Sequence, residues 1–345
     1  MQVNTRVSEN LFIENLVKNF TRSPFQVNGL QESDAELIRL DGTSTILAVT
    51  TDSISEEISS GLYDDFRQAG WMAVMINLSD LAAVGAVPLG LVMQETLPVE
   101  IKEQDIMNIQ MGIHNAVQAC GTYILGGDTN RGRSIMLGGT ALGIISDGKP
   151  MTRKGCSPGD ILCTTGKPGL GNAYAFEKLF IPADKRTITY LPKAKLQEGY
   201  LIKQFASACI DSSDGFVAAL DQLMRVNGCG FRLFADTEVF TAQEALALAS
   251  ATGTGAEVFL SAIHGDFELV FTVPSGRAEE LAQYEKAGGF SIIKIGEVIE
   301  EPAIEFLIKG KKRKPDTGYI RNLYEHYAEN PGGYLNELNA AWNNS

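Results

Sequence analysis

Four short motifs rich in oxygen ligands stand out along this chain of 345 residues. They are Thr50-Thr51-Asp52, Asn77-Leu78-Ser79-Asp80, Gly126-Gly127-Asp128-Thr129 and Asp211-Ser212-Ser213-Asp214-Gly215. Mg²⁺ prefers oxygen ligands, and proteins usually hold it with a few carboxylates that share it with a polyphosphate. Carboxylates alone would repel ATP, whereas carboxylates with bound Mg²⁺ help neutralise the charge on a transferred phosphoryl group. The four motifs together therefore predict a site for metal-bound phosphate.

Each motif taken alone also has a simpler structural interpretation. Asp214 precedes Gly215 and a predicted helix, so it could be a helix cap, but Asp211 adds a second carboxylate that capping does not need. Asp80 borders an apolar helical stripe, where a carboxylate is costly unless it is paired or metal-bound. Asp52 and Asp128 each follow a predicted strand, where capping a loop is the alternative. The case for phosphate chemistry rests on the four motifs occurring in one chain.

Other chemistries have less support. The chain has three widely separated histidines and neither HExxH nor CxxC, which argues against zinc sites and acyl transfer. Residues 166–171 resemble a phosphate loop only loosely, because the GK[ST] ending is missing and Pro168 lacks a backbone donor; a tight strand-to-helix turn is favoured. Arg153, beside a Gly-rich junction, could form a forked contact with phosphate oxygens.

Composition narrows the class of protein. A formal net charge of −13 argues against nucleic acid as a partner, because binding to its backbone relies on Lys and Arg. The five cysteines form no CxxC pair and suggest free thiols in a reducing compartment. We find no signal peptide and no run of 18 apolar residues. These features predict a cytoplasmic protein without membrane spans.

Apolar periodicity predicts an α/β (α+β) chain of two domains. A polar, turn-rich junction at residues 152–160 divides it into residues 1–150 and 151–345. The strands are expected near residues 45–50, 89–96, 122–125, 134–145, 161–165, 230–234, 267–273 and 291–298. The helices are expected near residues 65–84, 103–119, 195–208, 215–226, 241–250 and 277–287. Asp52 then follows the first strand and Asn77 and Asp80 share one helix face, which would bring the motifs together.

The motifs resemble those of thiamine-monophosphate kinases in order and spacing, over about residues 30 to 275. Asn77 to Ala86 is the most specific part, and the junction motif at residues 152–160 also matches. The wider superfamily includes aminoimidazole ribonucleotide synthetase. The resemblance implies the two-domain fold of that superfamily, in which the N-terminal domain forms a barrel with the domain of a twofold mate and the C-terminal domain is larger. It also implies a homodimer that uses ATP and Mg²⁺ and a small phosphorylated substrate.

The resemblance also implies site residues. The metal ligands would be Asp34, Thr50, Asp52, Asp80, Asp128, Asp211 and Asp214. The nucleotide contacts would be Thr51, Gly126, Gly127, Asp128, Arg153 and Ser213. Asp214, Asp80 and Arg153 would be catalytic, and the γ-phosphoryl group would pass directly to the substrate phosphate.

The sequence departs from the family mainly on the acceptor side. The early Gly-Asp-Asp element reads Ser33-Asp34-Ala35 within residues 32–35, and a stretch near thiamine reads differently at residues 53–58. Gly265 replaces the first Glu of another element, and Asp316-Thr317 stands where Trp or Phe is expected. The leading hypothesis is a thiamine-monophosphate kinase type of phosphotransferase whose acceptor is open. Two alternatives are a related ATP-dependent enzyme with another substrate and a non-catalytic nucleotide-binding regulator.

Overall fold

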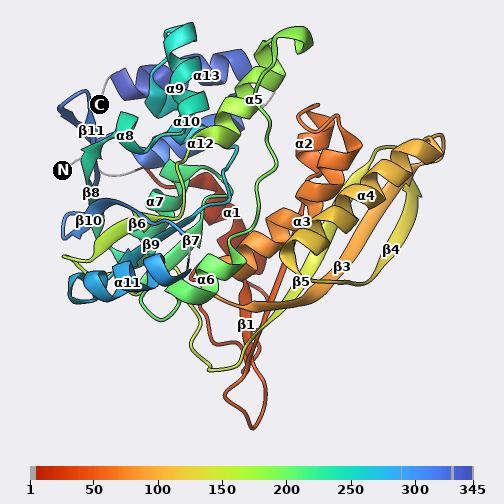
Figure 1. The fold of residues 1–345 in the computed structure, drawn as a ribbon, viewed down its shortest axis with the longest axis horizontal. Coiled ribbons are helices and arrows are strands. Elements are labelled where there is room, and N and C mark those ends of the chain that lie inside the picture. Colours follow the sequence, from red (N-terminus) through yellow and green to blue (C-terminus); the bar gives the residue numbers. More distant parts are fainter. Residues whose placement is uncertain (1–4, 289, 328–329, 344–345) are drawn as a thin grey trace.

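Two mixed β-sheets, each with helices packed against it, make up the protein (Figure 1). The computed structural model describes residues 5–288, 290–327 and 330–343. The strands are β1 (Glu36–Arg39), β2 (Ile46–Ser53), β3 (Val87–Pro98), β4 (Ile124–Gly132), β5 (Met136–Ile145), β6 (Ile161–Thr164), β7 (Ala208–Asp211), β8 (Gly230–Asp236), β9 (Leu269–Val273), β10 (Ile293–Ile299), β11 (Ile304–Ile308) and β12 (Lys311–Arg313). The α-helices are α1 (Ser8–Val17), α2 (Ser55–Ser59), α3 (Phe66–Ala83), α4 (Glu103–Cys120), α5 (Leu170–Phe180), α6 (Leu196–Ile202), α7 (Phe216–Asn227), α8 (Thr237–Phe240), α9 (Gln243–Thr252), α10 (Ala256–Ser261), α11 (Ala278–Gly288), α12 (Thr317–Tyr327) and α13 (Pro331–Asn343).

The first sheet has the strand order β1-β2-β5-β3-β4. Its strands pair antiparallel except β3 and β4, which are parallel. In β5, buried residues alternate with more exposed ones, as expected for a sheet with one face on a core. Helices α3 and α4 lie on that face, while β4 is exposed along almost its whole length (Figure 1).

Helix α3 lies at the centre of the molecule and is buried on nearly all sides. The Asp65 side chain caps its start by accepting a hydrogen bond from the backbone N–H of Arg67 at 2.9 Å. It crosses α4 closely, because a Cβ at Gly70 or Gly112 would lie 2.1 Å from a backbone oxygen of the other helix. Its last turn, with Ala82, packs into the core of the second sheet. Helix α3 therefore connects the two halves and carries Asp80 to the boundary between them.

The second sheet has the order β12-β11-β8-β10-β6-β9-β7 and is antiparallel except for the parallel pair β8 and β11. Side chains of α7, α10, α12 and α13 pack on one face, and those of α6 and α11 on the other. No helix in the described part of the chain is long and apolar enough to cross a membrane.

Most of the predicted elements are confirmed, with some differences in extent. The strand predicted at 122–125 begins two residues later as β4, which continues to Gly132. Gly126, Gly127 and Asp128 therefore lie within a strand rather than after one. The helix predicted at 195–208 ends at Ile202. The sequence reasoning missed β11, β12 and the helices α12 and α13, which cover the second sheet.

Candidate functional site

Three carboxylates from distant parts of the chain meet where the two halves join. Asp34 precedes β1, Asp80 lies in the last turn of α3, and Asp211 ends β7. One oxygen from each lies within 4.8 Å of the others. All three were predicted as metal ligands, and the structure brings them together.

Hydroxyl groups orient two of these carboxylates. Thr50 Oγ1, near the end of β2, donates a hydrogen bond to Asp80 Oδ2 at 2.5 Å. Ser79 Oγ donates to Asp211 Oδ2 at 2.6 Å, and Ser213 Oγ donates to Asp211 Oδ1 at 3.1 Å. Because these hydroxyls fix the carboxylates, the group is preorganised and little ordering is needed when a ligand binds.

One cation balances part of this negative charge. The Arg153 guanidinium lies 2.9 Å from Asp34 Oδ1, and the Asp34 side chain is only 1% exposed. The pKa of Arg153 is raised by the charges of Asp34, Asp211 and Asp80 despite the opposing effect of burial. Arg153 therefore stays charged beside the three carboxylates, as expected of a residue that also faces phosphate.

The remaining negative charge is unfavourable without a further cation. Burial, followed by the nearby charges of Asp211 and Asp34, raises the pKa of Asp80 well above its usual range. Burial and the charge of Asp34 raise the pKa of Asp211 to about 7. Both shifts mean that desolvation and like-charge repulsion oppose ionisation of the group. Within the described residues, Asp34 Oδ2 is buried and has no hydrogen-bond partner. A set of oxygen donors with excess negative charge and a free buried oxygen fits a hard divalent cation such as Mg²⁺.

Two more predicted ligands lie within electrostatic reach of the three carboxylates. The backbone N–H of Asp52 donates to Asn77 Oδ1 at 3.0 Å, which ties the end of β2 to α3. The charge of Asp52 contributes to the raised pKa of Asp80. Asp214 lines a cavity of about 150 Å³ together with Asp211, Ser213 and Arg153. Its pKa rises to about 6, first through desolvation by the surrounding protein and then through the charge of Glu9.

The other predicted nucleotide contacts lie apart from this group. Thr51 follows Thr50 on β2 and so points to the opposite side of the sheet, where its hydroxyl donates to the carbonyl oxygen of Gly139 at 2.8 Å. Asp128 is exposed on β4 and accepts a hydrogen bond from Asn130 at 2.6 Å. Gly126 and Gly127 pair with β3 in the same strand. Thr51, Gly126, Gly127 and Asp128 thus lie outside the group of three carboxylates. Their contacts with nucleotide stay predictions.

The weak phosphate-loop candidate at residues 166–171 is a strand-to-helix turn, as the sequence favoured. Asp266 accepts hydrogen bonds from the backbone N–H groups of Gly169 and Gly171, both at 2.8 Å. These donors are the ones a phosphate would need, so the turn is closed by a carboxylate at the start of α5.

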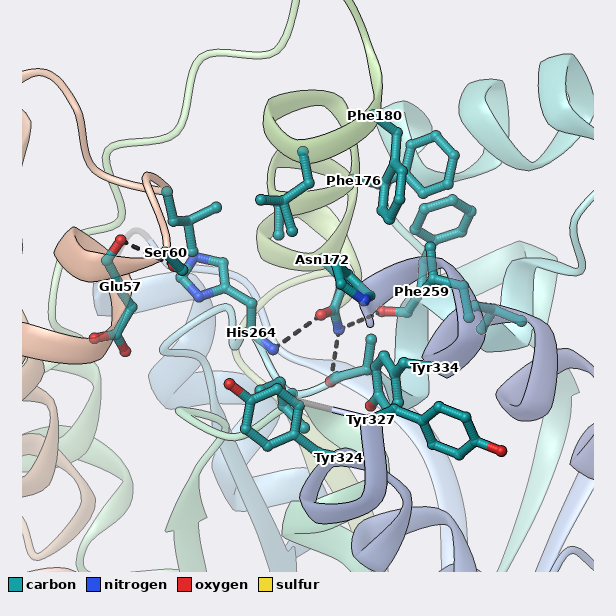
Figure 2. Close-up of a pocket in the computed structure, with 18 of the residues that line it drawn as sticks. Glu57, Ser60, Asn172, Phe176, Phe180, Phe259, His264, Tyr324, Tyr327 and Tyr334 are labelled. Carbon is teal, nitrogen blue, oxygen red and sulfur yellow. Dashed lines mark hydrogen bonds between the residues drawn. The ribbon is translucent and has the colours of Figure 1, made fainter. Parts of the chain in front are cut away.

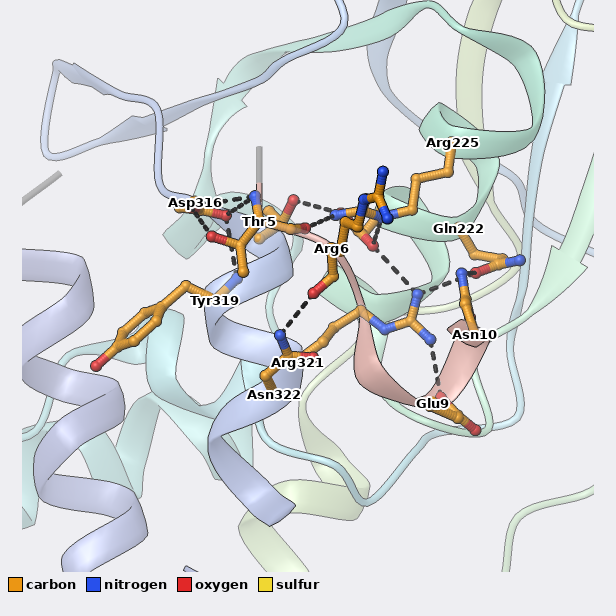
Figure 3. A network of polar contacts seen from close by, with 12 residues as sticks. Thr5, Arg6, Glu9, Asn10, Gln222, Arg225, Asp316, Tyr319, Arg321 and Asn322 are labelled. Carbon is orange, nitrogen blue, oxygen red and sulfur yellow. Dashed lines mark hydrogen bonds and ion pairs between the residues drawn. The ribbon is translucent and has the colours of Figure 1, made fainter. Parts of the chain in front are cut away.

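The N-terminal helix α1 completes the cavity that holds Asp214, and the sequence reasoning did not anticipate it. Glu9, Asn10 and Ile13 of α1 line that cavity. Figure 3 shows how the segment is attached to the C-terminal half: the Arg321 guanidinium lies 3.0 Å from Glu9, and Asn10 donates to Gln222 at 3.1 Å.

The departure at Asp316-Thr317 has a structural explanation in this same region. Asp316 accepts hydrogen bonds from the backbone N–H and the hydroxyl of Thr5, the latter at 2.6 Å (Figure 3). The Thr317 hydroxyl donates to the buried Asp221 at 2.6 Å. Both residues therefore hold α12 and the N-terminal segment in place.

A larger cavity of about 350 Å³ lies on the other side of the acidic loop formed by residues 211–215, and Figure 2 shows its lining. Aromatic side chains from α5, α10, α12 and α13 and the buried His264 form its walls. Glu56 and Glu57 of α2 line one side. Aromatic residues scattered over four helices gave no periodic signal in the sequence, so this cavity was not predicted.

Comparison with known proteins gives a consistent picture. Residues 32–145 match the family model described as AIR synthase related protein, N-terminal domain. A thiamine-monophosphate kinase from Escherichia coli O157:H7 is 30% identical over 252 residues, covering 70% of this chain and 75% of that protein. The thiamine-monophosphate kinase from Pyrococcus horikoshii is 27% identical over 283 residues, covering 78% of this chain and 84% of the relative.

Solved structures share the fold at lower identity. The complex described as AaThiL with AMPPCP and TMP superposes with a TM-score of 0.71 at 21% identity, covering 91% of this chain and 98% of that one. Thiamine monophosphate kinase from Aquifex aeolicus gives 0.70 at 20% identity, with 90% and 100% covered. HypE, a hydrogenase maturation protein from E. coli, gives 0.67 at 18% identity, with 89% and 96% covered.

Proposed function

Because the chain belongs to the thiamine-monophosphate kinase family, we propose that it transfers the γ-phosphoryl group of ATP to the phosphate of thiamine monophosphate. The observation that carries the proposal is the close group of Asp34, Asp80 and Asp211, partly or fully buried, with Arg153 as its cation. Such a group suits phosphoryl transfer, where catalysis consists mainly of positioning and charge stabilisation. The acceptor is itself a phosphate that is already anionic near neutral pH, so the reaction needs no strong general base.

Each residue of the group has a role in this reaction. Asp34, Asp80 and Asp211 would hold Mg²⁺, with Asp52 and Asp214 as further ligands. When bound, Mg²⁺ would neutralise phosphate charge and help align the reacting groups. Arg153 would bind phosphate oxygens while Asp34 holds its guanidinium in place. Ser79, Thr50 and Ser213 keep the carboxylates oriented through the hydroxyl hydrogen bonds described above.

We place the phosphates of ATP in the cavity between α1 and the Asp211–Gly215 loop. Arg153, Ser213 and Asp214 line it, and all three were predicted for the nucleotide or metal. Glu9 and Asn10 of α1 close its other side, which would limit the access of water to the transferred group.

Steady-state ADP release tests the proposal. With Mg-ATP present, adding thiamine monophosphate should start ADP formation, whereas thiamine without its phosphate should not serve as acceptor. ADP formation that is indifferent to thiamine monophosphate would refute this acceptor and favour a related ATP-dependent enzyme.

We further propose a homodimer formed through the open face and edge of the first sheet. Strand β4 is exposed along almost its entire length and includes Ile124 and Leu125, which are 40% and 56% exposed. Val92 of β3 and Met136 of β5 add apolar surface at 41% and 48% exposure. An unpaired edge strand with apolar neighbours is a surface that proteins usually cover. Light scattering coupled to size exclusion should give twice the chain mass, and Leu125→Glu should give the monomer; a monomeric unmodified protein would contradict this.

The remaining expectations concern organisation and compartment. We propose that the chain divides into domains of residues 1–150 and 151–345. Helix α1 belongs to the first by sequence but contacts Arg321 and Asn322 of the second. We also expect the protein to work in the cytoplasm, because its five cysteines are free thiols.

A further inference from the structure

The aromatic cavity has two walls of packed rings, and α2 lines a further side of it. One wall contains Phe176, Phe180 and Phe259, and the rings of Phe176 and Phe259 meet edge to face with centroids 5.7 Å apart. The other contains Tyr324, Tyr327 and Tyr334, and Tyr324 and Tyr334 also meet edge to face at 6.0 Å. Both walls appear in Figure 2. Because the rings already pack on one another, the cavity is formed before a ligand enters and suits a flat ring.

Glu57 brings an unusual charge to this cavity. Its Oε2 is buried and has no hydrogen-bond partner among the residues that the structure describes. Desolvation raises the pKa of Glu57 to about 7, with further contributions from the charges of Asp52, Glu56 and Asp214, although a hydrogen bond from its own backbone N–H opposes the shift. No ion pair to Glu57 forms within the part of the chain that the structure describes. The described surroundings of Glu57 therefore supply no positive charge. A carboxylate whose charged neighbours are all acidic is costly to the protein alone.

The turn after α2 is held by hydrogen bonds to the backbone of Glu57. The carbonyl oxygen accepts hydrogen bonds from the Leu62 backbone N–H at 2.9 Å and from the Ser60 hydroxyl at 3.1 Å. These bonds close the turn after α2 and do not depend on the side chain. These backbone bonds therefore leave the buried Oε2 of Glu57 without a structural role among the described residues.

The cavity lies directly against the acidic loop of the phosphate site. A Cβ on Gly265, the residue after His264, would lie 2.0 Å from the carbonyl oxygen of Ser212 and 2.1 Å from that of Ser213. Asn172 fixes this wall by accepting a hydrogen bond from the His264 backbone N–H at 2.9 Å and donating to Phe259 and Ala262 at 2.8 and 2.9 Å (Figure 2). The wall of the aromatic cavity at His264 and Gly265 therefore packs on the loop that carries Asp211 and Asp214.

We propose that Glu57 determines acceptor specificity by pairing with a positively charged heteroaromatic ring held between the phenylalanine and tyrosine walls. The inference rests on the proposed phosphotransfer, since it assigns the ring end of the same acceptor. The walls supply aromatic faces that attract a cation, and Glu57 supplies the opposite charge. The thiazolium of thiamine monophosphate is such a ring. A neutral ring of the same shape would leave the Glu57 carboxylate without its partner and would bind more weakly.

Glu57→Gln tests this, because it keeps the shape of the side chain and removes its charge. The matched control is Glu279→Gln, which makes the same change at an exposed position on α11, outside the cavity. Binding of thiamine monophosphate is measured by calorimetry, and KM and kcat by ADP release. We expect Glu57→Gln to weaken binding and raise the acceptor KM by about tenfold, the size expected for a charged contact in a partly desolvated site. The kcat and the KM for ATP should change by less than about twofold, and Glu279→Gln should resemble the unmodified protein.

A second probe separates the charge from other effects of the substitution. A thiamine monophosphate analogue with a neutral thiophene in place of the thiazolium should bind the unmodified protein more weakly, and Glu57→Gln should not weaken it further. Equal binding of thiamine monophosphate to both glutamine variants would overturn the assignment while leaving the kinase proposal intact. Charge-dependent binding without turnover would instead refute the kinase proposal and leave the ring site standing. No binding of thiamine monophosphate to the unmodified protein would overturn both.

Discussion

Replacing Asp211 with asparagine should stabilise the metal-free protein while abolishing its chemistry. The asparagine keeps the size of the side chain, and its amide can bond to the hydroxyls of Ser79 and Ser213, which accept as well as donate. What disappears is the negative charge of the buried Asp211, which lies beside Asp34 and Asp80. The substitution thus removes a charge that the proposed chemistry needs but that destabilises the metal-free folded protein.

The size of the effect follows from the shifted pKa of Asp211. In the folded protein this pKa rises from 3.8 to about 7, a difference of roughly three units at about 1.36 kcal/mol each. Folding therefore loses up to about 4 kcal/mol through this carboxylate at pH 8, where it must ionise. Below the unfolded pKa the carboxyl is protonated in both states and nothing is lost. The stability contributed by the bound proton is thus present at low pH and is lost as the pH rises through about 7.

Thermal unfolding in EDTA, followed by circular dichroism at pH 8 and pH 5, measures this difference. We expect Asp211→Asn to melt above the unmodified protein at pH 8 and the gap to shrink at pH 5. The control is Asp41→Asn, which makes the same change of charge at an exposed loop position. Turnover of Asp211→Asn should fall by about a hundredfold or more, as for loss of a preorganised electrostatic group. A lower melting point at pH 8 in EDTA, or a gap that does not depend on pH, would refute the electrostatic reasoning.

Three further predictions concern the metal and two buried aspartates. ATP affinity measured by calorimetry should fall steeply in EDTA, because the carboxylates then repel the phosphates; equal affinity would contradict the metal assignment. Asp266→Ala should lower the free energy of unfolding in urea by about 1–3 kcal/mol, because the amides of Gly169 and Gly171 lose their acceptor; no change would show that water replaces the carboxylate. Asp221→Ala should cost about 3–5 kcal/mol in the same assay, since the bonded Arg225 and Arg321 lose a buried partner, and a loss below 1 kcal/mol would mean that the network contributes little.

The sequence could predict elements whose pattern is local. Helix α4 and strand β3 followed from apolar periodicity, and the turn at Gly215 before α7 followed from local residue types. Periodicity did not locate the C-terminal helices α12 and α13. Their buried side chains, such as Leu338 and Trp342, pack on the second sheet, whose strands come from distant parts of the chain.

The residues of the site that belong to acidic motifs could be predicted from the sequence. Asp80 and Asp211 were assigned as ligands, and the structure brings them together with Asp34. The position of Asp128 was not predictable, because its motif lies within an exposed edge strand whose neighbours depend on pairing across the sheet. Glu57 was missed because the chemistry of a lone glutamate depends on burial, which sequence alone does not reveal.

Phosphorus NMR of the protein with Mg-ATP and thiamine monophosphate tests the central claim most directly. The proposed kinase should consume the thiamine monophosphate signal and produce the two coupled resonances of thiamine diphosphate, in step with ADP and without free phosphate. ADP that accumulates with free phosphate while thiamine monophosphate persists would contradict transfer to this acceptor.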